Sequence, residues 1–207
     1  MDPYGKEELL NFYDRRLEKH GDSPGAVGWT SIGQHRRYQA ILHAAGDLTG
    51  KKILDFGCGK GDLYGFLRDS GRLVGYCGVD VNPNLVDLAR RKHPEAEFLV
   101  HDVEERPLAR TFDVILICGV FNLRIAGIAE SLRSSLVRLM PLCREGLHLN
   151  VPSARAAHKG VDLHYEVPEE LLAFARRELS PSATLHDDLV EDELFLSVFR
   201  EEIEKGI

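Results

Sequence analysis

Residues 53–63 constrain this chain most, because an apolar run there gives way to glycines at alternate positions. Ile53–Phe56 is short and apolar, which is typical of a buried parallel strand. Gly57, Gly59 and Gly61 follow, and a helical pattern begins directly after them. Glycine permits positive φ and lets a ligand approach where a Cβ would collide. The pattern predicts an α/β fold with a ligand site at the carboxyl edge of its sheet.

The spacing of these glycines separates two classes of ligand. A dinucleotide site has the form G-x-G-x-x-G, with the pyrophosphate at the helix N-terminus. Here Asp62 stands where the third glycine of that fingerprint would fall, and its carboxylate would repel a phosphate. The Gly-Lys-Ser/Thr of a Walker loop is also missing at the expected spacing. The turn therefore favours a ligand without phosphate.

Four residues of this turn match a family motif. Asp55, Gly57, Gly59 and Gly61 occupy the defined positions of the pattern (D/E)-x-G-x-G-x-G. In this the segment resembles motif I of the class I S-adenosyl-L-methionine-dependent methyltransferases, which implies that these residues and Cys58 bind that cofactor. The resemblance covers roughly residues 50–123 in detail, and extends to about residue 200 by the order of elements.

The resemblance also implies a fold and a reaction. The fold is a three-layer α/β sandwich of the Rossmann-like type, with a seven-stranded, mostly parallel sheet whose last strand is antiparallel. The cofactor is S-adenosyl-L-methionine, and the product is S-adenosyl-L-homocysteine. Since a sulfonium is already an activated leaving group, the protein must mainly hold the acceptor in line with the methyl carbon. A general base is needed only for an acceptor that is protonated at the working pH.

The second strand of this pattern is expected over Leu73–Val79, and it leads into Asp80. Asp80 lies about twenty residues past the turn, the place of a carboxylate that holds a ribose diol. The resemblance implies that Asp80 takes this role and that Val81 packs on adenine. Asn82 is a plausible N-cap for the next helix, with Pro83 at its first position.

Two further strands complete the expected cofactor site. A third strand over Glu97–Val100 leads to Asp102, for which the resemblance implies a hydrogen bond from the adenine amino group. The backbone N–H of Val103 would then face a ring nitrogen. A fourth strand over Phe112–Ile117 delivers Cys118 and Gly119 to the same edge of the sheet.

The candidates for acceptor binding and catalysis come after the fourth strand. Asn122 and Arg124 fall where the family's acceptor usually sits, although a helix cap and a solvated arginine explain them equally well. His148 lies on an expected fifth strand over Gly146–Val151, and shares a face with Asn150 at period two. It is a candidate catalytic residue, but a satisfied buried histidine explains it at least as well.

A later loop offers two more candidates. His164 and Tyr165 precede a helix at the substrate edge, and are assigned as a candidate base and a candidate substrate contact. His158 and Lys159 are interpreted as surface residues. No histidine pair has ligand spacing such as H-x-x-x-H, so no metal site is predicted.

The N-terminal region carries the single tryptophan of the chain, Trp29. It is interpreted either as an anchor between the N-terminal helices or as a lid residue that contacts the substrate. Arg37 is expected to bind the methionine carboxylate of the cofactor, in preference to Arg36, because a guanidinium makes a bidentate contact with a carboxylate.

Composition limits the partners of the protein. The formal net charge is −7, which argues against a nucleic-acid substrate held on a basic surface. Four cysteines without a C-x-x-C pair predict reduced thiols and a cytoplasmic protein. The start of the chain does not read as a signal peptide, and no apolar run is long enough for a membrane span. A monomer or homodimer that acts on a small molecule is expected.

The remaining pattern predicts an N-terminal helical extension or lid over residues 1–48, followed by one sheet domain over residues 49–207. The expected elements outside the motifs are helices over 6–19, 31–45, 125–140 and 168–178, and a hairpin of 183–186 with 194–199.

The predicted function is methyl transfer from S-adenosyl-L-methionine to an oxygen or nitrogen of a small molecule. One alternative is a non-catalytic Rossmann-like module that binds the cofactor or a partner. A protein methyltransferase is a further alternative. An N-P-P-Y motif after the fourth strand would mark an amide or adenine methylase, but Cys118–Phe121 occupies that place.

Overall fold

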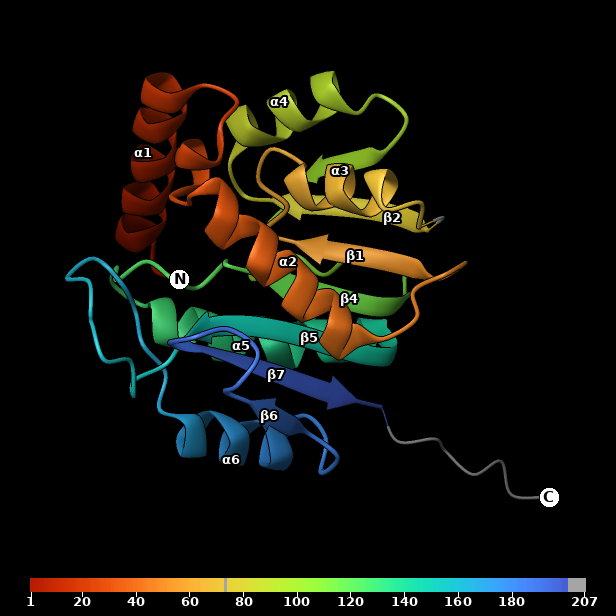
Figure 1. The fold of residues 1–207 in the computed structure, drawn as a ribbon, viewed down its shortest axis with the longest axis vertical. Coiled ribbons are helices and arrows are strands. Elements are labelled where there is room, and N and C mark those ends of the chain that lie inside the picture. The colour runs from red at the N-terminus through yellow and green to blue at the C-terminus, as the bar shows by residue number, and fades with distance from the viewer. Residues whose placement is uncertain (73, 201–207) are drawn as a thin grey trace.

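The computed structural model describes residues 1–72 and 74–200, which form a seven-stranded sheet between two layers of helices (Figure 1). The strands follow the order β3-β2-β1-β4-β5-β7-β6. Their bounds are β1 Lys52–Phe56, β2 Gly75–Asp80, β3 Glu97–Val100, β4 Phe112–Cys118, β5 Cys143–Pro152, β6 Thr184–His186 and β7 Glu193–Phe199. The predicted strand start at Leu73 lies outside the described residues.

The pairing of the strands confirms the predicted topology. β1 to β5 pair in parallel, whereas β7 runs antiparallel to both β5 and β6. Because the order reverses between β1 and β4, the carboxyl ends of these two strands flank a switch point. A ligand crevice is expected there in an open α/β sheet.

Helices cover both faces of the sheet (Figure 1). The α-helices are α1 Pro3–His20, α2 Ser31–Ala45, α3 Asp62–Asp69, α4 Pro83–Lys92, α5 Ile128–Leu139 and α6 Pro168–Glu178, and two short 3₁₀ turns are η1 Pro24–Val27 and η2 Met140–Leu142. α2 and α3 share one apolar cluster with the sheet, and α5 and α6 share another on the opposite face. The N-terminal helix α1 lies across the end of the sheet.

The buried face of α2 continues into the core of the sheet. Tyr38, Ile41 and Leu42 pack in one cluster with Ile53 of β1 and Leu116 of β4. Burial of a large aliphatic side chain contributes about 1.5–3 kcal/mol. The boundary predicted at residue 48 therefore does not separate two packing units. Only the segment before α2 wraps the sheet domain from outside.

Helix termini differ slightly from the predicted ones, for local reasons. α1 begins at Pro3 because the Asp2 carboxylate caps it, accepting from Gly5 N at 2.7 Å. α5 begins at Ile128, after Gly127 in the left-handed region, three residues later than predicted. α2, α6 and β3 have the predicted bounds. Among the described residues, no helix is long and apolar enough to cross a bilayer.

Candidate functional site

The glycine turn after β1 is built from left-handed backbone. Gly57, Gly59 and Gly61 have φ of 77°, 53° and 80°. The turn is held against β2, since Gly57 N and Cys58 N both donate to the carbonyl of Val79, at 2.8 and 3.0 Å. Residues with a Cβ rarely adopt these φ values, which explains the three glycines in terms of backbone conformation.

Space around the turn distinguishes Gly59 from its two neighbours. A Cβ at Gly57 would lie 2.3 Å from Val120 Cγ2, and one at Gly61 would lie 3.0 Å from the Phe98 ring. A Cβ at Gly59 would meet nothing closer than Val27 Cγ1, at 3.4 Å, and Gly59 lines the cavity. Packing therefore leaves no room for a Cβ at Gly61 or at Gly57, although Gly57 also lines the cavity, whereas Gly59 presents bare backbone with space beside it.

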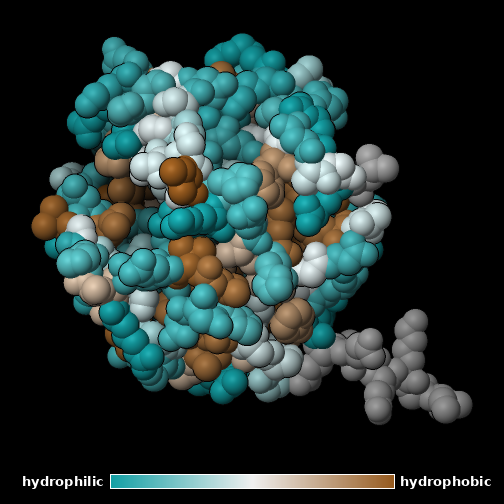
Figure 2. Space-filling view, viewed as in Figure 1, coloured by the Kyte–Doolittle hydropathy of each residue, from teal (hydrophilic) through white to brown (hydrophobic). Residues whose placement is uncertain are grey.

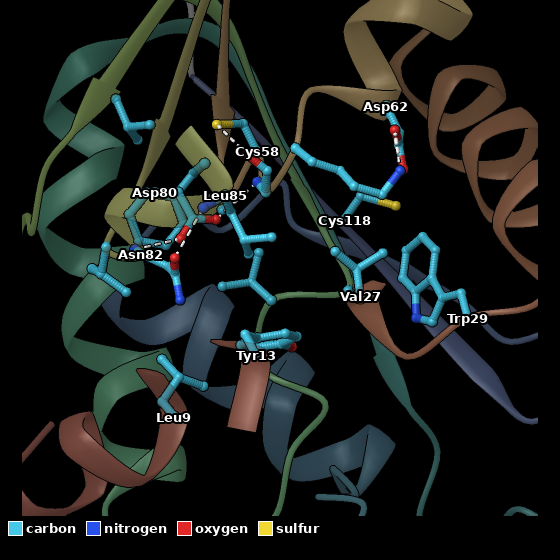
Figure 3. Close-up of a pocket in the computed structure, with 18 of the residues that line it drawn as sticks. Leu9, Tyr13, Val27, Trp29, Cys58, Asp62, Asp80, Asn82, Leu85 and Cys118 are labelled. Atoms are coloured by element: carbon cyan, nitrogen blue, oxygen red, sulfur yellow. Dashed lines mark hydrogen bonds and ion pairs between the residues drawn. The ribbon is translucent and has the colours of Figure 1, made fainter. Parts of the chain in front are cut away.

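Asp80 stands at the carboxyl end of β2, beside this bare backbone (Figure 3). One carboxylate oxygen accepts from Gly59 N and the other from Asn82 N, both at 2.8 Å. Burial raises the pKa of Asp80, and the backbone N–H groups partly oppose that rise. Each oxygen keeps a further lone pair for a hydroxyl, so Asp80 fits the ribose role. Val81, the predicted adenine contact, also lines the cavity.

Asp55 lies behind the turn, outside the cavity lining. It is buried, and it accepts a hydrogen bond from the Tyr76 hydroxyl at 2.5 Å. Burial raises its pKa from 3.8 to about 7, although the Tyr76 bond acts in the opposite direction. The structure thus gives the acidic residue of the motif a supporting position, whereas we had assigned it to cofactor contact.

The residues assigned to adenine recognition after β3 are also placed differently. Asp102 pairs with Lys6 Nζ of α1 at 2.7 Å and accepts from Glu104 N at 2.8 Å, and it does not line the cavity. Burial opposes its ionisation, but the Lys6 ammonium and that N–H hold its pKa below the usual value. Val103 is buried in the core. Of this segment, His101 lines the cavity instead.

The segment before α2 closes the cavity on one side. Tyr13 of α1 and Val27 of η1 face the glycine turn, with Asp80 and Asn82 on one side of the space and Trp29 and Cys118 on the other (Figure 3). This segment is fixed to α4 because the Asp14 carboxylate accepts from Asn82 Nδ2 at 2.8 Å.

A partly buried charge cluster joins the same segment to the turn. Lys60 Nζ is 2.9 Å from the Asp22 carboxylate and 2.6 Å from that of Asp62, and Lys92 bridges the same two acids at 2.8 Å each. Gln34 also donates to Asp62 at 2.9 Å. Burial opposes the ionisation of Asp62, but the two lysines hold its pKa low. A carboxylate thus occupies the N-terminus of α3, where a dinucleotide site would need room for phosphate.

Trp29 covers the end of β4. A Cβ at Gly119 would lie 2.0 Å from Trp29 Cζ2, so the indole lies directly against this glycine. The Arg37 guanidinium lies over the indole ring, and its Nε donates to Glu193 at 2.9 Å. Arg37 is therefore engaged by a buried carboxylate and does not line the cavity, and its contact with the methionine carboxylate stays a prediction.

Polar groups on β5 support the end of β4. Cys118 and Gly119 line the cavity, as predicted. Gly119 N donates to Asn150 Oδ1 at 2.9 Å, and Asn150 Nδ2 donates to Glu193 at 2.7 Å. Asn150 is thus a support for the turn after β4.

His148 points away from the site. Its Nδ1 is 2.9 Å from the Ser197 hydroxyl, its ring lies against Phe199, and burial lowers its pKa to about 4. Because this histidine is buried, neutral and satisfied within the core, the structure does not support it as a catalytic residue. The alternative of a satisfied buried histidine fits its surroundings.

The segment after β5 brings the remaining candidates together. His164 N donates to Asn122 O at 2.8 Å, and Arg124 N donates to Asp162 O at 2.9 Å. His164 Nε2 lies 2.7 Å from Glu166, which also binds Arg133 through both oxygens. Tyr165 accepts from Gly160 N at 2.7 Å. None of Asn122, Arg124, His164 and Tyr165 lines the cavity, so their assignment stays a prediction.

Twelve residues of the cavity lining were not predicted, and four of them, Leu9, Tyr13, Val27 and Tyr38, come from the segment before β1. The twelve residues are Leu9, Tyr13, Val27, Tyr38, Phe56, Lys60, Asp62, Val79, Asn82, Leu85, His101 and Val120. The helical spacing of Leu9 and Tyr13 marked one face of α1, but nothing in that spacing indicated which partner the face covers.

The cavity fits a nucleoside ligand. Its empty space is about 790 Å³, part of which is open to solvent. Its lining combines apolar walls with the Asp80 carboxylate, the lysine-paired carboxylate of Asp62 and the bare Gly59 backbone. No group of three or more potential ligands for a metal ion is present in residues 1–72 and 74–200.

Comparisons with known proteins agree with this geometry. Residues 53–140 match the family model described as a methyltransferase domain. The fatty-acid O-methyltransferase of Mycolicibacterium smegmatis is 30% identical over 102 residues, 46% of this chain and 37% of that protein. The demethylmenaquinone methyltransferase of Beutenbergia cavernae is 33% identical over 137 residues, 64% of this chain and 54% of that protein.

The fold has solved counterparts as well. Magnesium protoporphyrin IX methyltransferase from Synechocystis PCC 6803, solved with bound SAH, superposes with a TM-score of 0.66 at 17% identity, over 95% of this chain and all of that one. These matches confirm the predicted fold. The chain aligns with only about two fifths to half of the length of the two curated relatives described above.

Proposed function

We propose, from the premise that residues 53–140 form a methyltransferase domain of the class I S-adenosyl-L-methionine-dependent family, that this protein methylates a small molecule. The accepting atom is an oxygen or a nitrogen. The relatives and solved counterparts that carry methyltransferase names support the reaction class, and the cavity supports the cofactor.

The observation that carries the proposal is the pairing of Gly59 with Asp80. Bare backbone and a carboxylate lie side by side, bonded to each other, at the switch point of the sheet. This pair suits a sugar with two hydroxyls and leaves no provision for phosphate, because Asp62 blocks the helix N-terminus.

The bound cofactor would supply a methyl group on a sulfonium, which leaves as a neutral thioether. The chain would supply position and exclusion of water. Asp80 would hold the ribose, Val81 and Leu85 would pack on the base, and the backbone of residues 57–59 and 118–119 would contact the ligand. Tyr13, Val27 and Trp29 would cover the ligand, which would lower the local dielectric and exclude water.

Calorimetric titration of the purified protein tests the cofactor assignment. We expect S-adenosyl-L-methionine and S-adenosyl-L-homocysteine to bind at micromolar concentration, and NAD and ATP not to bind. Binding of either phosphate-bearing nucleotide in preference to the methionine nucleosides would contradict the proposal.

Transfer itself is tested by incubation with methyl-labelled cofactor and a mixture of metabolites, followed by mass spectrometry. Label in a small-molecule product supports the proposal. Tight cofactor binding without any labelled product would favour the non-catalytic module, and label confined to added proteins would favour a protein methyltransferase.

A further inference from the structure

Glu193 is a buried acid on a strand that takes no part in the cavity lining. It is 3% exposed, it is the single ionisable residue of β7, and no residue of β7 lines the described cavity. Figure 2 shows hydrophilic and hydrophobic side chains interspersed over the face where Figure 1 draws α2, whereas Glu193 lies in the interior. Because a buried charge is unfavourable and an apolar side chain would fill the same space, packing alone does not explain a glutamate here.

The two carboxylate oxygens of Glu193 bind two different elements. Oε1 accepts from Arg37 Nε of α2 at 2.9 Å, and Oε2 accepts from Asn150 Nδ2 of β5 at 2.7 Å. Because a carboxylate accepts and does not donate, it fixes the orientation of the Asn150 amide and leaves Oδ1 to accept from Gly119 N, at 2.9 Å. One acid thus orients both a guanidinium and an amide.

Both of these routes end at the same wall of the cavity. The Arg37 guanidinium carbon lies 5.3 Å from the centre of the Trp29 ring that it covers, and Trp29 lies so close to Gly119 that no Cβ would fit there. The second route ends on the backbone N–H of Gly119 itself. Trp29 and Gly119 both line the cavity, so Glu193 is connected to this wall twice.

The backbone that carries Glu193 is held in place from outside the cavity. Asp192, directly before β7, has φ of 65° and is the one non-glycine residue with positive φ in the part of the chain that the structure describes. Its carbonyl accepts from Ser153 N at 2.8 Å, and its carboxylate accepts from Ala157 N at 3.1 Å. Aspartate tolerates left-handed backbone better than most residues. These contacts fix where the chain enters β7, and with it the place of the Glu193 carboxylate.

We infer that Glu193 is a positioning residue, which holds Trp29 and Gly119 in place as the wall for the amino-acid part of the cofactor. Asp80 and Leu85, the contacts proposed for ribose and base, lie across the space from Trp29 in Figure 3. The opposite wall is therefore left for the rest of the ligand. This inference rests on the proposed function and adds to it a residue that does not touch the ligand.

Two ligands that differ in the amino-acid part test this role by calorimetry. S-adenosyl-L-homocysteine has that part, whereas 5′-methylthioadenosine has a methyl group in its place. Glu193→Gln replaces one accepting oxygen by an amide that can only donate. We expect S-adenosyl-L-homocysteine to bind about tenfold more weakly or worse, and methylthioadenosine to stay within about twofold of wild type. An equal loss for both ligands, or no loss for either, would overturn the inference.

Asn150→Ala interrupts one of the two routes and leaves the ion pair of Glu193 with Arg37 intact. We expect a selective loss again, about threefold or more for S-adenosyl-L-homocysteine and within about twofold for methylthioadenosine. This variant keeps the inference testable if Glu193→Gln fails to fold. A loss shared equally by the two ligands, or no loss, would overturn it here as well.

Glu166→Gln is the matched control. Glu166 is also 3% exposed and also paired with an arginine, Arg133, but neither residue lines the described cavity. Its affinity for each ligand should stay within about twofold of wild type. If Glu166→Gln produces the same selective loss, then the loss of any buried ion pair produces it, and the inference is wrong.

The sign of the effect separates this role from direct contact of Arg37 with the cofactor. If Arg37 leaves Glu193 to bind the methionine carboxylate, Glu193→Gln frees the guanidinium and S-adenosyl-L-homocysteine binds more tightly. That result would overturn the inference and support the contact predicted for Arg37. Absence of binding to wild type would overturn the proposed function as well, whereas normal binding to wild type without a selective loss in the variants would overturn the role of Glu193 alone.

Discussion

Two parts of the carboxyl edge of the sheet differ in how they are built: the first edge, at the ends of β1 to β3, and the second edge, at the ends of β4 and β5. At the first edge, the groups that face the cavity are backbone and the Asp80 carboxylate, which two backbone N–H groups hold in place. At the second, segments far apart in the chain meet: the Trp29 indole lies against Gly119, and the backbone N–H of His164 donates to the Asn122 carbonyl. The first edge is therefore built from neighbouring residues, and the second from distant ones.

The two edges also differ in the direction in which each shifts the pKa of a buried carboxyl group. Asp55, in β1, has no cation against it among the described residues, and burial raises its pKa to about 7. Glu166, after β5, has its pKa lowered to about 2: burial opposes this, but His164 and Arg133 bind it. The first edge therefore contains an acid that is easily protonated, and the second a firmly ionised one.

The largest expected effect at the first edge comes from Gly59→Val. A side chain there would project into the space reserved for the ligand, so we expect cofactor affinity to fall at least 1000-fold, about 4 kcal/mol or more. Calorimetry measures the loss. Gly50→Val is the matched control, because Gly50 has φ of 73° with nothing within 4 Å of an added Cβ. If Gly59→Val binds the cofactor normally, the turn does not contact it.

The contrast between the two acids predicts opposite pH dependence of stability. For Asp55 the folded pKa lies above the unfolded value of 3.8, so its contribution is present at low pH and is lost as pH rises toward 7. Relative to Asp55→Asn, wild type should lose about 2–4 kcal/mol of unfolding free energy between pH 4.5 and 7.5. Urea unfolding at several pH values measures this difference.

Glu166→Gln provides the comparison from the other edge. Its folded pKa of about 2 lies below the ordinary 4.5, so the stability that it contributes is present above pH 4.5 and is lost as pH falls toward 2. Wild type and this variant should differ most near neutral pH and converge in acid. Parallel curves for both variants would contradict the assigned charge states.

Asp80→Ala should have an intermediate effect. Loss of a charge-assisted hydrogen bond to the ribose is expected to weaken cofactor binding by about 1–3 kcal/mol. Asp102→Ala sharpens the test, because Asp102 is engaged by Lys6 and should matter less to binding. If Asp102→Ala costs more affinity than Asp80→Ala, the ligand reaches Asp102 by displacing Lys6, and the adenine role first assigned to Asp102 is restored.

The smallest effect is expected for His164→Ala. His164 binds Glu166 and does not line the cavity, so kcat with saturating acceptor should stay within about twofold, with about 1 kcal/mol lost in stability. A fall of two orders of magnitude in kcat at unchanged stability would identify His164 as a base and would exclude an acceptor that is already ionised.

Sequence reasoning predicted the fold and the conformation of the glycine turn, because both depend on local rules. Gly57, Gly59 and Gly61 need left-handed backbone, and Asn82 caps a helix whatever lies elsewhere. It could not foresee contacts in which the partner comes from far along the chain. Lys6 pairs with Asp102 at a sequence separation of 96 residues, and Glu193 pairs with Arg37 at a separation of 156 residues. No local pattern near these residues indicates such a pairing.

The position of Trp29 has a practical consequence. It is the single tryptophan of the chain, and its indole forms part of the cavity wall between Gly119 and the Arg37 guanidinium. Fluorescence excited at the indole band therefore arises from one site alone, the wall of the cavity. The protein carries its own optical reporter, and stopped-flow recording can follow occupancy of the cavity in real time without any attached dye.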